Sequence, residues 1–252
     1  MQNLFTYNSL LDLVRENNFL PARNNIDGDF AESDSMELFK DNLKKQSSNW
    51  EYRTKPVRYT YNKAFYRTGE FSTLDWANSI VVFGCSNVFG VGQDDHDNVT
   101  SVLERLIGVP VINMGVGGTS INFSLHNSII MGRAYPTPKA VIQLWTEESR
   151  CVHYTKKELV NSGSWNTAPG DYHAAWTSDP YNYKINALFA SLISQQLWQG
   201  KCKYYEASYF ENTAKTLECD RLPRIDLARD FIHFGNKTTL NTAETIANKL
   251  NL

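Results

Sequence analysis

The stretch SIVVFGCSNVFGVG, residues 79–92, joins a short apolar run to a glycine-containing corner. The run from Ile80 to Phe83 is made of β-branched and aromatic residues, which favours a buried strand. Gly84 ends the run, and two more glycines follow within eight residues. In open α/β sheets, ligands bind beyond the carboxyl ends of the parallel strands. The stretch therefore places the hydroxyl of Ser86 where a ligand would meet it.

Strand and helix patterns alternate along the chain after this corner. Short apolar runs predict strands at 80–83, 109–113, 140–145 and 203–207, and apolar residues at helical spacing predict helices at 99–106, 121–130, 183–199 and 239–250. Gly108 and Gly200 act as helix stop signals. Such alternation predicts an α/β domain with a mostly parallel sheet covered by helices on both faces.

Two other regions follow different patterns. Residues 1–70 contain short helical patterns at 9–14 and 36–44, turn signals between them, and an alternating segment at 57–62 that reads as an exposed strand. We therefore expect residues 1–70 to be an N-terminal extension packed on a main domain of residues 71–252. Residues 151–182 have weak periodicity and several aromatics, which predicts a long loop or lid.

Composition excludes several classes of function. Hydrophobic residues make up 42% of the chain and charged residues 21%, and the formal net charge is −2. This balance is typical of a globular protein and offers no basic surface for nucleic acid or an anionic membrane. The N-terminus lacks the basic and apolar segments of a signal peptide, and no apolar run reaches the length of a membrane span. We expect a cytoplasmic protein, or one built into a virion assembled there.

The cysteines and histidines do not predict a metal site. The four cysteines are far apart and none is at zinc-ligand spacing, so we expect free, buried thiols. The scattered histidines are expected at the surface or in packing contacts; they are His96, His126, His153 and His173.

Three short segments could carry chemistry. They are Gly84-Cys85-Ser86, the segment 113–119 with three glycines, and the segment 230–235 near the C-terminus. A serine nucleophile needs a general base and a carboxylate that orients it. Asp230 and His233 are three residues apart, which lets the carboxylate reach the ring. The backbone N–H groups of Ser86 and Gly118 are candidates to bind a developing oxyanion, because the backbone at such corners can approach a ligand closely.

These three segments, in this order, resemble the conserved blocks of the SGNH (GDSL-like) hydrolase family over roughly residues 78–252. The Gly-Asp-Ser block of the family corresponds to Gly84-Cys85-Ser86, its Asn-x-x-x-x-Gly block to Asn113–Gly118, and its Asp-x-x-His block to Asp230–His233. The resemblance implies a flavodoxin-like three-layer α/β/α fold and ester hydrolysis without metal or cofactor, often on acetyl groups of carbohydrates. It makes Ser86 the nucleophile, His233 the base and Asp230 its partner, with a small-molecule or glycan ester as the substrate.

One block departs from the family pattern. Where the family has Gly-x-Asn-Asp after the third strand, this chain has Leu144-Trp145-Thr146-Glu147. The asparagine that helps to hold the oxyanion is absent; Thr146 can donate a hydrogen bond in its place, whereas an ionised Glu147 only accepts. The alternative is therefore a non-catalytic binding or structural module on the same fold, either alone or as part of a virion. Candidate substrate-binding residues are Trp145 and Glu147 in this block and His173 and Trp176 in the expected lid.

Other interpretations of the same residues remain open. Residues 84–92 lack the spacing of a dinucleotide-binding loop. Cys85 is a conceivable nucleophile, but Ser86 fits the family position better. Acyl transfer between sugars would use the same triad as hydrolysis, and the sequence does not separate the two or specify the acyl group or the oligomeric state.

Overall fold

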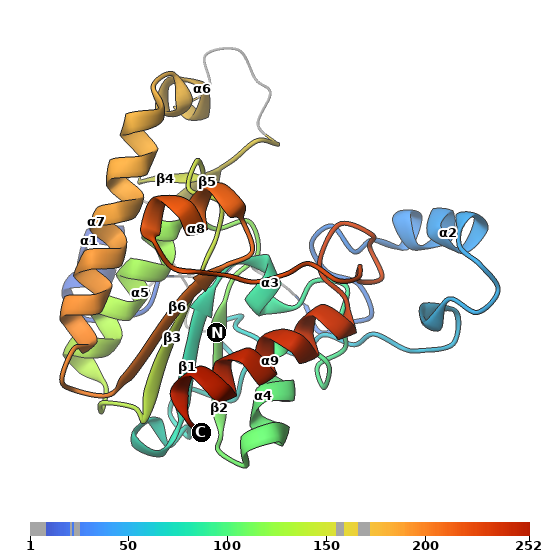
Figure 1. Ribbon diagram of the computed structural model, residues 1–252, viewed down its shortest axis with the longest axis horizontal. Helices are drawn as coiled ribbons and strands as arrows, with labels where there is room; N and C mark the ends of the chain where they lie inside the picture. The colour runs from blue at the N-terminus through green and yellow to red at the C-terminus, as the bar shows by residue number, and fades with distance from the viewer. Residues whose placement is uncertain (1–8, 21, 23–25, 155–158, 166–171) are drawn as a thin grey trace.

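The computed structural model describes residues 9–20, 22, 26–154, 159–165 and 172–252. Its centre is a parallel five-stranded sheet in the order β2-β1-β3-β6-β7 (Figure 1). The strands are β1 (Ile80–Gly84), β2 (Val111–Gly115), β3 (Ala140–Trp145), β6 (Lys203–Ser208) and β7 (Asp220–Arg221). Counted along the chain without the separate β4–β5 hairpin, this order is 2-1-3-4-5, the flavodoxin-like order. The predicted fold class is confirmed.

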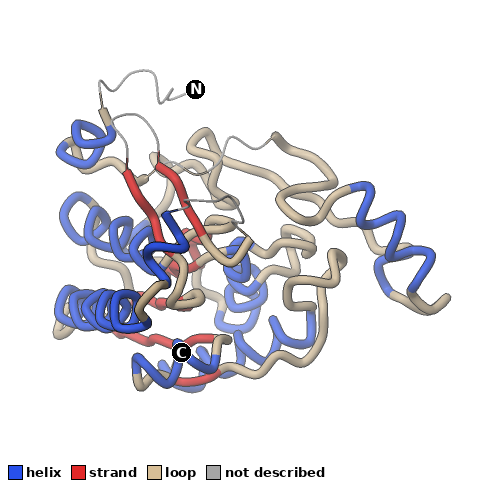
Figure 2. The backbone as a smooth tube through the Cα atoms, turned by 90° about the horizontal axis from the view of Figure 1, so that it is seen from above, coloured by secondary structure: helices blue, strands red, loops and turns tan. Residues whose placement is uncertain are grey.

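Helices cover both faces of the sheet (Figure 2). On one face α4 (Val99–Ile107) packs against α9 (Asn236–Leu250), and on the other α5 (Ile121–Ala134) packs against α7 (Pro180–Trp198). The strands are buried on both sides, and alternate residues face opposite layers. In β1, Ile80 and Val82 join the core cluster under α4 and α9, whereas Val81 and Phe83 join the cluster under α5.

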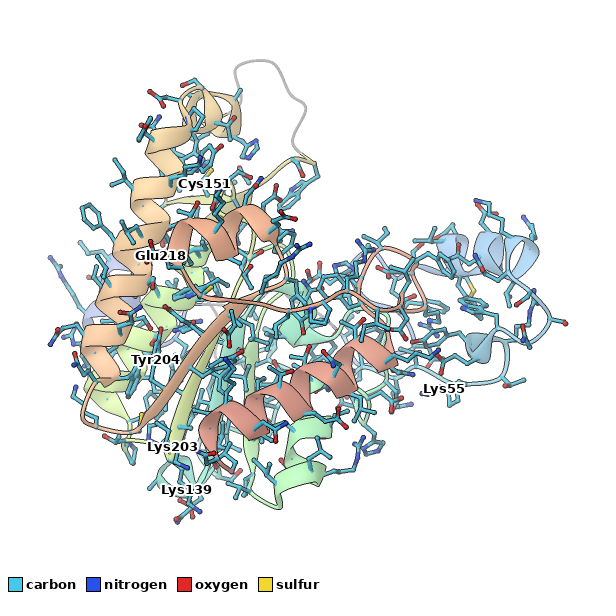
Figure 3. All side chains as sticks on the ribbon, in the orientation of Figure 1. Lys55, Lys139, Cys151, Lys203, Tyr204 and Glu218 are labelled. Carbon is cyan, nitrogen blue, oxygen red and sulfur yellow. The ribbon has the colours of Figure 1, made fainter. Side chains whose placement is uncertain are left out.

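Local sequence signals explain where these helices begin and end. The Asn98 side chain caps α4 by accepting hydrogen bonds from the N–H groups of Thr100 and Ser101. Gly108 ends α4 in the left-handed conformation, with φ of 66°. Asp179 caps α7 and Pro180 is its first residue, so α7 begins three residues before the predicted start. Lys139 directly precedes β3 and Lys203 is the first residue of β6, so the two lysines mark the amino ends of these strands (Figure 3).

The N-terminal segment contributes to the core. It contains α1 (Leu10–Arg15) and α2 (Met36–Lys45), both where the sequence predicts helices. Leu13, Leu20 and Tyr66 are buried in the same cluster as Val81 and Phe83 of β1. This part of the chain therefore shares its buried surface with the sheet.

The expected strand at 57–62 is wrong. Only an isolated bridge between Gly28 and Tyr59 forms there. Val57 and Tyr59 are 1% and 0% exposed and pack with Phe89 next to β1. The alternation reflects burial against α3 (Ser86–Phe89). Backbone N–H groups here donate to side-chain carboxylates, such as that of Asp94, and not to a neighbouring strand.

The expected loop or lid at 151–182 is also corrected. Its described parts form an antiparallel hairpin of β4 (Cys151–Tyr154) and β5 (Leu159–Ser162), followed by α6 (Tyr172–Thr177). These elements are too short to produce a periodic signal; residues 155–158 and 166–171 lie outside the described residues. Further short elements were not predicted: α3, α8 (Glu211–Leu217), β7 and two 3-10 turns, η2 (Glu51–Arg53) and η3 (Trp76–Asn78). None of the helices formed by the described residues has the length and apolar character to span a bilayer.

Candidate active site

Ser86 is the first residue of α3, at the carboxyl end of β1. The turn into α3 requires glycine at position 84, because a Cβ there would lie 2.4 Å from Val88 Cγ2 and 2.9 Å from the Leu144 carbonyl oxygen. Ser86 is 5% exposed. Its Oγ donates a weak hydrogen bond to Cys85 Sγ at 3.8 Å. The corner thus presents a nearly buried hydroxyl whose local partner is a poor acceptor.

The second sequence block lies directly beside this corner. The side chain of Asn113 connects β2 to α3, because its Nδ2 donates to the Val88 carbonyl at 2.9 Å and its Oδ1 accepts from Gly115 N–H at 2.9 Å. Val116 N–H donates to the Gly84 carbonyl at 3.3 Å, which continues the contact past the strand ends. Gly118 follows with φ of 68°, a conformation that favours glycine. Asn113 therefore holds the glycine loop next to the Ser86 corner.

Asp230 and His233 form a hydrogen-bonded pair in the loop before α9. His233 Nδ1 lies 2.6 Å from Asp230 Oδ2, and the N–H groups of Ile232 and His233 both donate to Oδ1 at 3.0 Å. Burial raises the pKa of the Asp230 carboxyl, but the hydrogen bonds from His233 and from Ser33 outweigh it, so the pKa lies below its usual value. Asp230 is therefore an ionised acceptor that fixes the orientation of the His233 ring and leaves Nε2 for a reacting group.

Two contacts join the loop of this pair to the Ser86 corner. Arg229 N–H donates to the Gly92 carbonyl at 3.1 Å, and a Cβ at Gly92 would lie 2.7 Å from Ala228 Cβ. The Tyr209 ring lies 4.3 Å from that of Phe234, and burial together with the nearby Cys85 thiol raises the pKa of its hydroxyl. The Phe234 contact therefore places Tyr209 beside the residue that follows His233.

Ser86 and His233 are not hydrogen-bonded to each other within the part of the chain that is described. Ser86 Oγ is hydrogen-bonded to Cys85 Sγ, and His233 Nδ1 is hydrogen-bonded to Asp230. In free enzymes such bonds are often long and shorten only when the substrate binds.

The N-terminal segment supplies two site residues that sequence reasoning missed. Ser33 Oγ donates to Asp230 Oδ2 at 2.7 Å and lies 3.4 Å from His233 Nδ1. Next to it, the Asp34 carboxylate forms an ion pair with Arg229 Nη2 at 2.7 Å, with both side chains at least 95% buried. In the sequence, Ser33-Asp34 looks like an ordinary turn, so no local signal would have identified it.

Further contacts tie this segment to both sides of the site. Tyr59 OH donates to Asp34 Oδ2 at 2.6 Å and accepts from Gly92 N–H at 2.7 Å. Glu32, with φ of 57°, lies against the glycine loop, since a Cβ at Gly117 would be 2.7 Å from Glu32 Cδ. Residues 32–34 therefore bridge the glycine loop and the loop of Asp230.

The altered third block places one candidate donor at the strand end. Thr146 is 2% exposed, and its Oγ1 has no hydrogen-bond partner among the described residues. Buried hydroxyls are normally paired, so a group left unpaired is a candidate for binding a ligand atom. Glu147 extends further out, with 36% of its side chain exposed and Arg150 Nε 3.7 Å from its carboxylate.

The other candidate substrate-binding residues are not brought to the candidate triad. Trp145 is 1% exposed in a core cluster with Ala187 and Ala190, and its Nε1 donates to Glu206 Oε2 at 2.9 Å. Its position in β3 directs the ring under α7, which corrects the expectation that it contacts substrate. His173 and Trp176 lie on α6, which Figure 1 shows beyond the β4–β5 hairpin and away from α3.

Cys85 and Cys151 are buried, while Cys202 and Cys219 are half-buried. Within the described residues, His, Cys, Asp and Glu side chains do not gather in a group of three or more that could hold a metal ion.

Comparison with known proteins gives similarity at the level of the fold. No family model matches the chain, and no curated protein sequence matches it. A structure from Bacteroides uniformis assigned as a GDSL-like lipase is 10% identical, with a TM-score of 0.46 over 69% of this chain and 96% of its own.

Two further structures are similar in the same way. A carbohydrate esterase family 2 enzyme with a carbohydrate-binding domain, from Corynascus thermopiles, is 12% identical with a TM-score of 0.44, over 73% of this chain and 70% of its own. AlinE4, an esterase of the SGNH-hydrolase family, is 14% identical with a TM-score of 0.36, over 71% and 99%.

Proposed function

We propose that this chain is a serine esterase that hydrolyses an O-acyl ester through Ser86, His233 and Asp230. The observation that carries the proposal is the 2.6 Å contact between His233 Nδ1 and the ionised Asp230, in a loop that packs against the Ser86 corner. A histidine held in this way has a defined tautomer, with Nδ1 protonated and Nε2 free to accept a proton. Ser86 at the end of β1 is the nucleophile that this base serves.

The reaction follows from these positions. Ser86 Oγ attacks the ester carbonyl carbon while His233 Nε2 takes the hydroxyl proton, and His233 then gives that proton to the departing alcohol. Water attacks the resulting acyl-enzyme with His233 again as the base, which releases the carboxylic acid and restores Ser86. Asp230 keeps the ring oriented and stabilises its charged form in both steps.

We assign three donors to the developing oxyanion. The N–H of Ser86 belongs to the first turn of α3, where backbone N–H groups have no acceptor within the helix. Gly118 contributes a second N–H from the loop that Asn113 holds in place. The unpaired Oγ1 of Thr146 replaces the missing family asparagine as the third. Removing one such donor lowers kcat by about a hundredfold or more in other hydrolases.

The burial of Ser86 favours a small acyl group. Ser86 as a residue is only 5% exposed, so little open surface surrounds it for a long acyl chain. We therefore propose an acetyl ester as the substrate, with a carbohydrate as the alcohol. The carbohydrate rests on the resemblance of the three sequence blocks to the SGNH family.

A covalent label tests the proposal. The chain is incubated with a fluorophosphonate, and the adduct is located by mass spectrometry in the wild type, Ser86→Ala and His233→Ala. One adduct on Ser86, lost in both variants, is expected because only an activated serine reacts. The absence of an adduct on the folded wild type would instead favour the non-catalytic binding module, the alternative suggested by the altered third block.

A further inference from the structure

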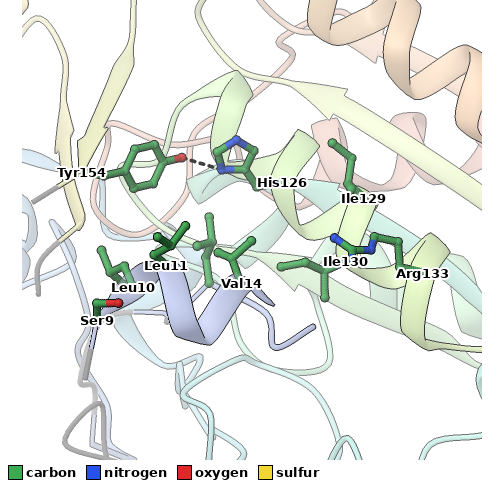
Figure 4. A pocket seen from close by; sticks show the side chains of 10 residues that line it. Ser9, Leu10, Leu11, Val14, His126, Ile129, Ile130, Arg133 and Tyr154 are labelled. Carbon is green, nitrogen blue, oxygen red and sulfur yellow. Dashed lines mark hydrogen bonds between the residues drawn. The ribbon is translucent and has the colours of Figure 1, made fainter. Parts of the chain in front are cut away.

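A concave site lies between α1, α5 and β4 (Figure 4). We call it the α1–α5 groove. Its volume is about 700 Å³, within the range of sites that hold small molecules. Leu11 and Val14 of α1 face Ile129 and Ile130 of α5 across it. No residue of the candidate triad or of the glycine loop lines the groove, so it is separate from the site described above.

One end of the groove is neutral and has its polar groups paired. Tyr154 OH lies 2.5 Å from His126 Nδ1, and Figure 4 shows this hydrogen bond at the rim. Burial lowers the pKa of His126, so the ring is uncharged at neutral pH. An alkyl chain bound at this end would therefore not lie against a charged group.

The other end carries a cation. Arg133 stands in the last turn of α5, two helical turns from His126 and therefore about 10 Å further along the helix. It lines the groove and is exposed, and within the described part of the chain it has no hydrogen bond or ion pair. An anion bound there would be the first partner of the guanidinium.

We propose that the α1–α5 groove binds an amphiphile with one apolar chain of medium length and one anionic head, of the fatty-acid class. The alkyl chain of the ligand lies between Leu11 and Ile129, and its carboxylate contacts Arg133. Both parts follow from the asymmetry of the groove, which is apolar along its length, uncharged at His126 and positive at Arg133. The proposal does not rest on esterase activity.

Titration calorimetry with paired ligands tests it. Decanoate, octanoate and decyltrimethylammonium are titrated into the wild-type chain below their micelle concentrations. Decanoate is expected to bind once per protein molecule and about fifteenfold more tightly than octanoate, because it has two more methylenes and each buried methylene contributes about fourfold. The cationic ligand has an alkyl chain one carbon longer, yet it is expected to bind more weakly than decanoate because its head faces Arg133.

Variants at exposed positions assign the binding to the groove. Arg133→Gln is expected to weaken decanoate about two- to fivefold, the effect of an exposed ion pair, and to remove the preference over the cation. Leu11 is 57% exposed, so Leu11→Asp leaves the fold intact while placing a like charge in the groove, and it should abolish decanoate binding. Arg15→Gln is the matched control, since Arg15 is exposed and lies 3.7 Å from Asp12 outside the groove.

Three results would overturn the proposal. They are equal binding of the two head groups by the wild type, decanoate binding that survives Leu11→Asp, and attachment to phosphatidylglycerol vesicles without binding of free decanoate. The last result would identify a membrane surface as the ligand. Far-UV circular dichroism of each variant verifies that its fold is unchanged.

Discussion

Replacing Asp34 with alanine should cost the chain a large part of its stability. Arg229 Nε lies 3.0 and 3.1 Å from the two oxygens of this carboxylate, and Nη2 lies 2.7 Å from one of them. The side chains of Arg229 and Asp34 are 5% and 0% exposed. Removing one partner of such a pair leaves a buried, uncompensated charge.

The expected loss is about 3–5 kcal/mol in the free energy of unfolding, the usual cost of breaking a buried pair from one side. Loss of the acceptor of Tyr59 OH acts in the same direction. Because unfolding free energies are typically about 5–15 kcal/mol, the variant should be close to marginal. For a chain of this length the melting temperature should fall by about 10 °C.

Urea unfolding followed by far-UV circular dichroism measures the change. The matched control is Asp41→Ala, which breaks an ion pair of 3.0 Å whose Lys44 and Asp41 side chains are 76% and 53% exposed. It should cost less than about 1 kcal/mol. The double variant Asp34→Leu with Arg229→Met should recover much of the loss, because it removes both charges. If Asp34→Ala costs no more than Asp41→Ala, the assignment of a buried, structure-holding pair is wrong.

Three further changes probe the site. Ser33→Ala removes a hydrogen bond to the Asp230 carboxylate and should lower kcat/KM for p-nitrophenyl acetate roughly tenfold, with KM little changed. Ser33→Thr retains the hydroxyl and should keep most of the activity. Equal losses in both variants would contradict a positioning role for Ser33. The pKa of Asp230 is lowered in the folded chain, so its carboxylate adds stability above its usual pKa of 3.8, and this stability is lost as the pH falls through the pKa of the folded state. Asp230→Asn should therefore flatten the acid side of a curve of unfolding free energy against pH. Gly115→Ala would put a Cβ 2.4 Å from Phe89 N and should cost about 1–3 kcal/mol in urea unfolding. The control is Gly28→Ala, where the nearest atom to the added Cβ would be 3.8 Å away. A loss for Gly115→Ala no larger than for this control would show that α3 moves easily to make room.

The four long strands of the central sheet and the triad candidates could be predicted from sequence because their signals are local. β3 (Ala140–Trp145) was predicted with its observed bounds, and β1 to within one residue, since a strand buried on both faces is a continuous apolar run. Ser86 follows from a strand that ends in glycine. Asp230 and His233 follow from a spacing of three residues that a single turn brings together.

Predictions from local pattern failed where burial had a different cause. The alternation at 57–62 was attributed to a strand, but it comes from packing of Val57 and Tyr59 on α3. Trp145 was expected at the substrate site because it stands beside the third block, yet its place at the end of β3 turns it into the core under α7. A residue's position in the sequence does not say which layer its side chain enters.

The sequence was sufficient for the alternation of strands and helices, and for the identity of the nucleophile, base and carboxylate candidates, because each depends on residues within a few positions of one another. The supporting contacts needed the folded chain. Ser33 reaches Asp230 across 197 residues, and Asp34 reaches Arg229 across 195. Such partners are chosen by which surfaces the packed layers bring into contact, and a serine followed by an aspartate looks the same in any turn.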